Sequence, residues 1–116
     1  MTIQEIYREI SEDYSSVAKR LPGEKLIITV VRMFRDKNDF DSMIEAFQKR
    51  DGKLLFETSH NMKGASANLG FSKLCQASSE ICEIARRGEN ISSAEPFVEM
   101  AKKEYESIIM AISQLD

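Results

Sequence analysis

The chain has 116 residues, of which 42% are hydrophobic and 30% are charged, and its formal net charge is −3. This length and composition predict one globular domain over residues 1–116, because they suffice for a buried core. The mild acidity and the mixed charges argue against a nucleic-acid partner, which would require a concentrated Lys/Arg face.

The N-terminal residues and the apolar runs predict neither a signal peptide nor a membrane association. Residues 1–9 carry acids where a signal peptide needs an apolar core. The longest apolar run, residues 26–31, is far shorter than the ~20 residues that span a bilayer. Cys75 and Cys82 would lie roughly 10 Å apart along one predicted helix, beyond disulfide reach. We therefore expect a reduced, cytoplasmic protein.

The first half of the chain predicts helices. Residues 3–21 repeat apolar positions at helical spacing, although "EISEDYSS" could divide them into two shorter helices, and Pro22-Gly23 ends the pattern. Residues 24–37 predict a second helix in spite of their β-branched run, because the pattern covers several turns and no partner strand exists. Asp39 is the expected N-cap of a helix that ends near Asp51-Gly52.

The second half predicts three longer helices. Residues 53–68 form the first, and Gly70 is expected to take a left-handed conformation in the turn that follows. Ser72 is the expected N-cap of the next helix, which ends at Arg86-Arg87 before Gly88. Residues 92–95 read as a capping box with Pro96 in the first turn of the last helix.

We expect the last helix to bury an apolar stripe and to run nearly to the end of the chain. Its members are Phe97, Ala101, Tyr105, Ile108, Ile109, Ile112 and Leu115. Amphipathic helices joined by short turns predict an all-α, mostly antiparallel bundle over residues 24–116, with residues 1–21 as an N-terminal helical extension.

One constellation in the helix at residues 53–68 points to chemistry. The predicted core stripe of this helix is Leu55, Thr58, Met62, Ala65 and Leu69. His60, the only histidine, lies off this stripe, so its imidazole should be an exposed and largely neutral nucleophile at cell pH. Lys63 lies one turn further on the same face and could pair with an incoming phosphoryl group. Gly64 costs about 1 kcal/mol of helix stability relative to alanine, and it would leave room for a partner to approach.

The segment "HNMKGASANLG" at residues 60–70 resembles the signature H-x-x-K-G-x-x-x-x-L-G of histidine-containing phosphotransfer (HPt) domains. "FRDKNDFDSMIEAFQKRDG" before it and "LCQASSEICEIARRG" after it also resemble the helices that flank this signature, so the resemblance runs from about residue 21 to the C-terminus. It implies a four-helix bundle that exchanges a phosphoryl group with an aspartate of a receiver domain.

The resemblance also implies roles for single residues. His60 would be the phosphoacceptor through Nε2, Lys63 would stabilise the phosphoryl group, and Gly64 would provide clearance for the partner. The expected partners are response-regulator receiver domains and a (hybrid) histidine kinase. Mg²⁺ would be held by the receiver, so we expect no cofactor and no metal site on this chain, which we expect to be a monomer. The sequence has no P-loop or kinase-type nucleotide motif, which favours a phosphocarrier over an enzyme.

Family members often orient the histidine with a Glu or Gln of the next helix, and here Cys82 stands at that position. Glu83 is a possible substitute, although it points to another side of the helix. Phe56, Ala67 and Phe71 are candidates for an apolar docking surface beside His60.

Two other functions stay open. The first is an adaptor or decoy that binds a receiver without phosphotransfer. The second is an enzyme or a helical bundle that binds a metal or cofactor. The chain has few ligands for such a site, because it has a single histidine and no Glu-x-x-His pair.

Overall fold

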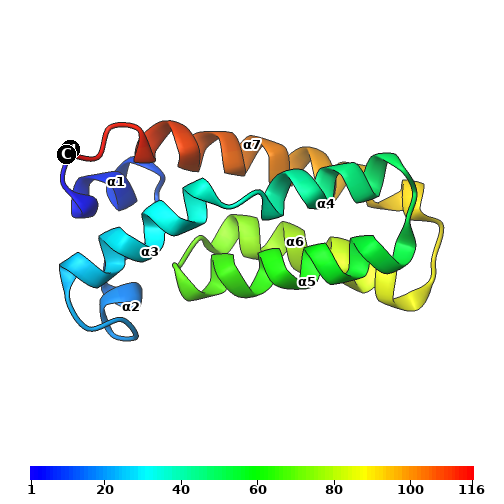
Figure 1. Cartoon of the computed structure of the whole chain (residues 1–116), viewed down its shortest axis with the longest axis horizontal. Helices are drawn as coiled ribbons and strands as arrows, with labels where there is room; N and C mark the ends of the chain where they lie inside the picture. The colour runs from blue at the N-terminus through cyan, green and yellow to red at the C-terminus, as the bar shows by residue number, and fades with distance from the viewer.

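The computed structural model describes residues 1–116 and contains only helices, without a strand (Figure 1). The elements are α1 (Ile3–Glu9), α2 (Tyr14–Ala18), α3 (Glu24–Asp36), α4 (Asp39–Gln48), α5 (Gly52–Asn68), α6 (Ser72–Arg87), the 3-10 turn η1 (Ile91–Ala94) and α7 (Glu95–Ile112). The all-α prediction is confirmed. None of these helices is both long and apolar enough to span a membrane.

Helices α4 to α7 form the antiparallel four-helix bundle (Figure 1). In it α5 packs against α4 and α6, and α6 packs against α7. Helix α3 precedes α4 and extends beyond the bundle at the end where α1 and α2 lie. The chain is extended at Lys37, between α3 and α4, and this interrupts the helical hydrogen bonding.

The N-terminal segment is divided into two short helices, as "EISEDYSS" suggested. Helix α1 ends at Glu9, Ser11 takes a left-handed φ of 58°, and the Asp13 side chain then accepts a hydrogen bond from the Ser15 amide to begin α2. Both helices contribute to the same core as the bundle, through the buried side chains Ile3, Ile6, Tyr7, Ile10 and Val17.

Three predicted helix starts differ from the structure. Asp39 is the first residue of α4 and not its N-cap, which is Asn38. Ser72 is likewise the first residue of α6, and its hydroxyl donates to the Glu12 carboxylate at 2.6 Å instead of capping its own helix. Glu12, on the N-terminal segment, thus takes the Ser72 hydroxyl that would otherwise cap α6.

The predicted capping box at residues 92–95 is also wrong. The Asn90 side chain accepts a hydrogen bond from the Ser92 amide, and the Ser93 hydroxyl donates to the Asn90 carbonyl at 2.6 Å. These bonds stabilise η1, which precedes α7 in the chain. Helix α7 therefore begins after Ala94, without a side-chain cap. Pro96 does lie in the first turn of α7, as predicted.

The core face of α7 is rotated from the predicted stripe. Ala101, Ile108 and Ile112 are buried as predicted, and Val98 and Ala111 join them. The other predicted members, Phe97, Tyr105, Ile109 and Leu115, are only half-buried. The Tyr105 ring stacks on the buried Phe40 ring of α4 at 4.0 Å between centroids, so this half-buried side chain still contributes to the contact between α4 and α7.

Candidate functional site

Helix α5 is fixed at both ends. At its start the Asp51 side chain accepts a hydrogen bond from the Leu54 amide at 3.1 Å. At its end the Arg20 guanidinium donates to the carbonyls of Ala67 and Asn68 at 2.9 and 3.2 Å. A cation at this position satisfies terminal carbonyls and complements the negative end of the helix dipole.

The turn after α5 is held by the N-terminal segment as well. The buried Tyr7 hydroxyl donates to the Leu69 carbonyl at 2.6 Å. Gly70 takes the predicted left-handed conformation, with φ of +69°, and a β-carbon on it would lie 2.7 Å from Cγ2 of Val17. The final Leu-Gly of the motif therefore has a structural role: Leu69 fills the core, and Gly70 lets α2 approach the turn.

The buried face of α5 contains small and apolar side chains that pack in the bundle. Leu55, Thr58, Met62 and Leu69 of the predicted stripe are buried, and Ala65 is half-buried. Ser59 and Ser66 are fully buried, and their hydroxyls donate to the carbonyls of Leu55 and Met62 at 2.6 and 2.5 Å. These polar groups are satisfied within the helix, so the face can pack closely.

The opposite face of α5 carries the predicted site. His60, Lys63, Gly64 and Ala67 are all exposed. The His60 ring lies against Phe56, one turn earlier, at 6.0 Å between centroids and 20° between planes. No hydrogen bond or ion pair involves the His60 side chain. The imidazole is thus exposed to an approaching reactant.

Lys63 and Gly64 lie on the same exposed face as His60. The Lys63 ammonium makes no ion pair, so it is free to bind an anion beside His60. A β-carbon on Gly64 would meet no atom within 4 Å. Nothing inside this chain therefore requires a glycine at this position, and the open space faces outward.

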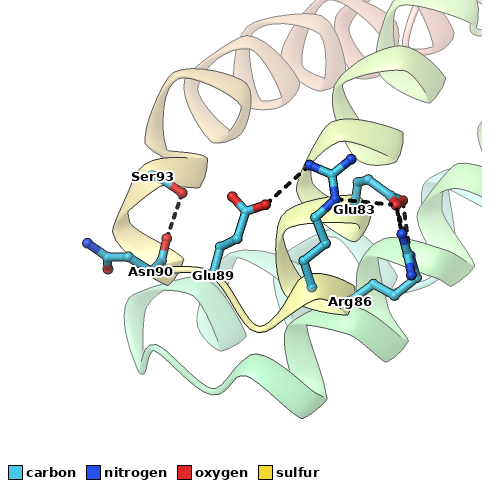
Figure 2. A network of polar contacts seen from close by, with 6 residues as sticks. Glu83, Arg86, Glu89, Asn90 and Ser93 are labelled. Atoms are coloured by element: carbon cyan, nitrogen blue, oxygen red, sulfur yellow. Dashed lines mark hydrogen bonds and ion pairs between the residues drawn. The ribbon is translucent and has the colours of Figure 1, made fainter.

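Neither Cys82 nor Glu83 forms a hydrogen bond or an ion pair with the His60 side chain. Cys82 is buried, and its thiol points to the Phe56 carbonyl with a sulfur–oxygen distance of 4.0 Å, a weak interaction. The Glu83 carboxylate accepts a hydrogen bond from Arg86 Nε at 2.8 Å, as Figure 2 shows. The Arg86 guanidinium, with smaller contributions from Arg87 and Lys63, lowers the pKa of Glu83. The histidine-orienting role considered for both residues receives no support from these contacts.

Phe71 does not belong to a docking surface, which corrects the prediction from the sequence. Its side chain is only 1% exposed. The ring stacks on Tyr7 at 5.7 Å and meets the Phe34 ring edge-on at 5.1 Å. The left-handed turn at Gly70 directs Phe71 into the end of the bundle, where α1 covers it. Ala67 is exposed and Phe56 is half-buried, so these two candidates stay accessible.

Sequence reasoning missed a mostly apolar cavity of about 200 Å³ between α3 and α5, none of whose lining residues belongs to the predicted site. Val30, Met33 and Phe34 line it from α3, and Ala65 lines it from α5. Met33 is 50% exposed at its edge. The helical period of residues 24–37 does not reveal this cavity, because only the path of α3 past α5 creates it.

Sequence reasoning also missed Arg20 and Tyr7. No local pattern marks them, because their partners lie 47 and 62 residues away in the chain. The structure contains no group of three or more His, Cys, Asp or Glu side chains placed to hold a metal ion.

Comparison with known proteins agrees with this geometry. A family model described as "Hpt domain" matches residues 30–116, from the middle of α3 to the C-terminus. Searches among curated proteins and among solved structures found no match. The matched region contains the whole motif at residues 60–70 and the four helices of the bundle. With most of its length matched, the chain belongs to the Hpt domain family, the phosphocarrier modules of two-component signalling.

Proposed function

We propose that the protein is a phosphorelay carrier that accepts a phosphoryl group on His60 and exchanges it with an aspartate of a response-regulator receiver domain. One observation carries the proposal: the only histidine is exposed on α5, beside the unpaired Lys63 and the open space over Gly64. A nucleophile, a cation and an unobstructed approach thus lie on one face of one helix.

The transfer is a substitution at phosphorus. The lone pair of the imidazole nitrogen, Nε2 in our proposal, forms the N–P bond, and the P–O bond to the receiver's aspartate breaks with its electron pair left on the carboxylate. The other ring nitrogen keeps its proton. Lys63 stabilises the negative charge that the phosphoryl oxygens bring, and the reverse reaction returns the group to a receiver.

The partner supplies what this chain lacks. We propose that the receiver holds the Mg²⁺ and that this chain needs no cofactor or nucleotide site. The phosphoryl group originates from a (hybrid) histidine kinase, and the exchange takes place in the cytoplasm with this chain as a monomer. The receiver covers His60 and extends over Gly64 and Ala67, the exposed residues of the same helix face.

The test is incubation with phosphorylated receiver domains and measurement of acid-labile phosphate on this chain. We expect the wild type to be labelled and His60→Gln to remain unlabelled, because no other histidine can replace His60. Glutamine keeps the size and polarity of the side chain at an exposed position, so the fold should be unaffected. A wild type that is labelled no better than His60→Gln across candidate receivers would show that the proposal is wrong.

A receiver-binding adaptor is the second candidate function, and the absence of any hydrogen bond to the His60 ring favours it. An adaptor would bind a receiver equally well as His60→Ala and would show no phosphotransfer. Binding and transfer measured on the same two proteins therefore separate the candidates.

A further inference from the structure

The His60 ring has an aromatic neighbour on its own helix. The centroids of His60 and Phe56 lie 6.0 Å apart with 20° between the ring planes, within the range of offset stacking. Both residues are on α5, one turn apart, so the helix itself sets their spacing. No polar group from α6 competes for the imidazole, since Cys82 points to the Phe56 carbonyl and Glu83 is bound to Arg86.

Phe56 is itself held in place. Its side chain is half-buried and packs against the hydrophobic core. Its carbonyl accepts a hydrogen bond from the Ser59 hydroxyl at 3.2 Å, in addition to the weak contact from Cys82 on α6. A ring anchored in the core can restrict the rotation of a more exposed ring beside it.

We propose that Phe56 is a positioning residue that holds the plane of the His60 imidazole for phosphotransfer, and this inference rests on the proposed function. Stacking occupies one face of the imidazole. The nitrogen lone pairs lie in the plane of the ring and point out from its edge, so the stacked neighbour does not block the attacking atom. The contact therefore restricts the nucleophile without shielding it.

The spectroscopic test uses the fact that the chain has a single histidine. The carbon-bound imidazole protons of His60 each give one NMR signal, and the ring current of Phe56 should shift these signals upfield. We expect Phe56→Leu to abolish this shift and Phe56→Tyr to keep it. Phe97→Leu is the matched control, because Phe97 is also a half-buried phenylalanine packed against the core but lies on α7, whereas the ring pair of His60 is with Phe56.

The kinetic test measures transfer from a phosphorylated receiver at increasing receiver concentration. We expect Phe56→Leu to lower the rate at saturating receiver about two- to tenfold. This factor is what the interaction energy of an aromatic pair gives when it is converted into a change in rate. The receiver concentration at half-maximal rate should stay unchanged, and Phe56→Tyr and Phe97→Leu should transfer like the wild type.

The outcomes distinguish this inference from the function on which it rests. If the wild type accepts no phosphoryl group, the proposed function is wrong and the positioning role falls with it. If the wild type transfers and Phe56→Leu matches it, only the positioning role is wrong. A Phe56→Leu protein that needs more receiver but reaches the same maximal rate would assign Phe56 to docking and would also overturn the inference, as would an unchanged NMR shift.

Discussion

At the scale of single residues, Gly64 is the position where the fold and the proposed function make opposite demands. The middle of a helix favours alanine over glycine by about 1 kcal/mol. The structure has room for a β-carbon there, with no atom within 4 Å. A partner that presses onto His60 would meet the same β-carbon, and we propose that this approach is the reason for the glycine.

We therefore predict that Gly64→Ala raises the free energy of unfolding by about 1 kcal/mol while it slows transfer from a receiver. Chemical denaturation and the phosphotransfer assay measure the two effects on the same protein. Gly52→Ala is the control, because Gly52 begins the same helix and its β-carbon would make only an ordinary contact, 3.5 Å from Ile91. Equal transfer by Gly64→Ala and the wild type would contradict the clearance role.

The sequence predicted the placement of the candidate site residues at this scale because they lie on one helix. Helical spacing alone places His60, Lys63 and Gly64 on one exposed face, and the structure has them there. Phe71 was predicted wrongly, because the direction of a side chain after a left-handed turn depends on the path of the chain beyond it. The stack of Phe56 on His60 was within reach of the sequence, since the two rings are four residues apart on one helix.

At the scale of elements, the turn between α5 and α6 depends on α2. Gly70 and Gly88 have the same left-handed φ of +69°, but only Gly70 faces a neighbouring element, Val17 of α2. The two glycines thus share a backbone conformation and differ in their surroundings, which makes them a natural pair for experiment.

We predict that Gly88→Ala destabilises the fold by roughly 1–2 kcal/mol, the strain of a left-handed alanine, and that Gly70→Ala destabilises it more. The added β-carbon of Gly70→Ala would lie 2.7 Å from the Val17 side chain, so α2 must move away. Chemical denaturation of both variants measures the difference. In the double variant Gly70→Ala/Val17→Ala, the part of the destabilisation that comes from the clash should be smaller. Equal destabilisation by the two single substitutions would mean that α2 adapts freely.

The sequence predicted the existence and order of the helices but not the contacts that decide where some of them begin. The periodicity of apolar residues indicates which face of each helix is buried, and several such helices in succession predict a bundle. Ser72 follows the local rule for an N-cap, yet Glu12 takes its hydroxyl from 60 residues away. The Asn90 side chain likewise binds the Ser92 amide, and residues 92–95 form the 3-10 turn and its link to α7 instead of a capping box. Such competition is tertiary, and it leaves no local signal.

At the scale of the whole molecule, the core extends beyond the region matched by the family model. That match begins at residue 30, but Ile3, Ile6, Tyr7 and Val17 are buried in the same core as the bundle. Tyr7 carries the only buried phenol hydroxyl, and it joins α1 to the end of α5. The stability of the molecule should therefore respond to the ionisation of this one group.

Burial raises the pKa of Tyr7 above its ordinary value of about 10, and burial also raises the pKa of Tyr14 and of Tyr105. A raised pKa in the folded state means that the unfolded chain loses its proton first as the pH rises. The stabilisation is complete below about pH 10 and is lost progressively at higher pH. We predict that the free energy of unfolding falls from pH 9 to pH 11.

The variant Tyr7→Phe separates this effect from general alkaline instability. At pH 7 it should be less stable by about 1–3 kcal/mol, because the buried Leu69 carbonyl loses its donor. Its stability should nevertheless fall less steeply between pH 9 and pH 11 than that of the wild type, in chemical denaturation at each pH. Tyr14→Phe is the control, since Tyr14 is less deeply buried. An unchanged slope in Tyr7→Phe would show that Tyr7 ionisation does not limit stability.

The anchoring of α5 at both ends has a consequence for how a phosphoryl group would act as a signal. Asp51 fixes the start of the helix, and Arg20 fixes its end. The His60 side chain between them is exposed and forms no hydrogen bond or ion pair, so a phosphoryl group there breaks no polar contact of the fold. We expect the phosphorylated and free proteins to share one backbone. The message would then be stored as a chemical mark that the next protein removes, and not as a change of shape that it recognises.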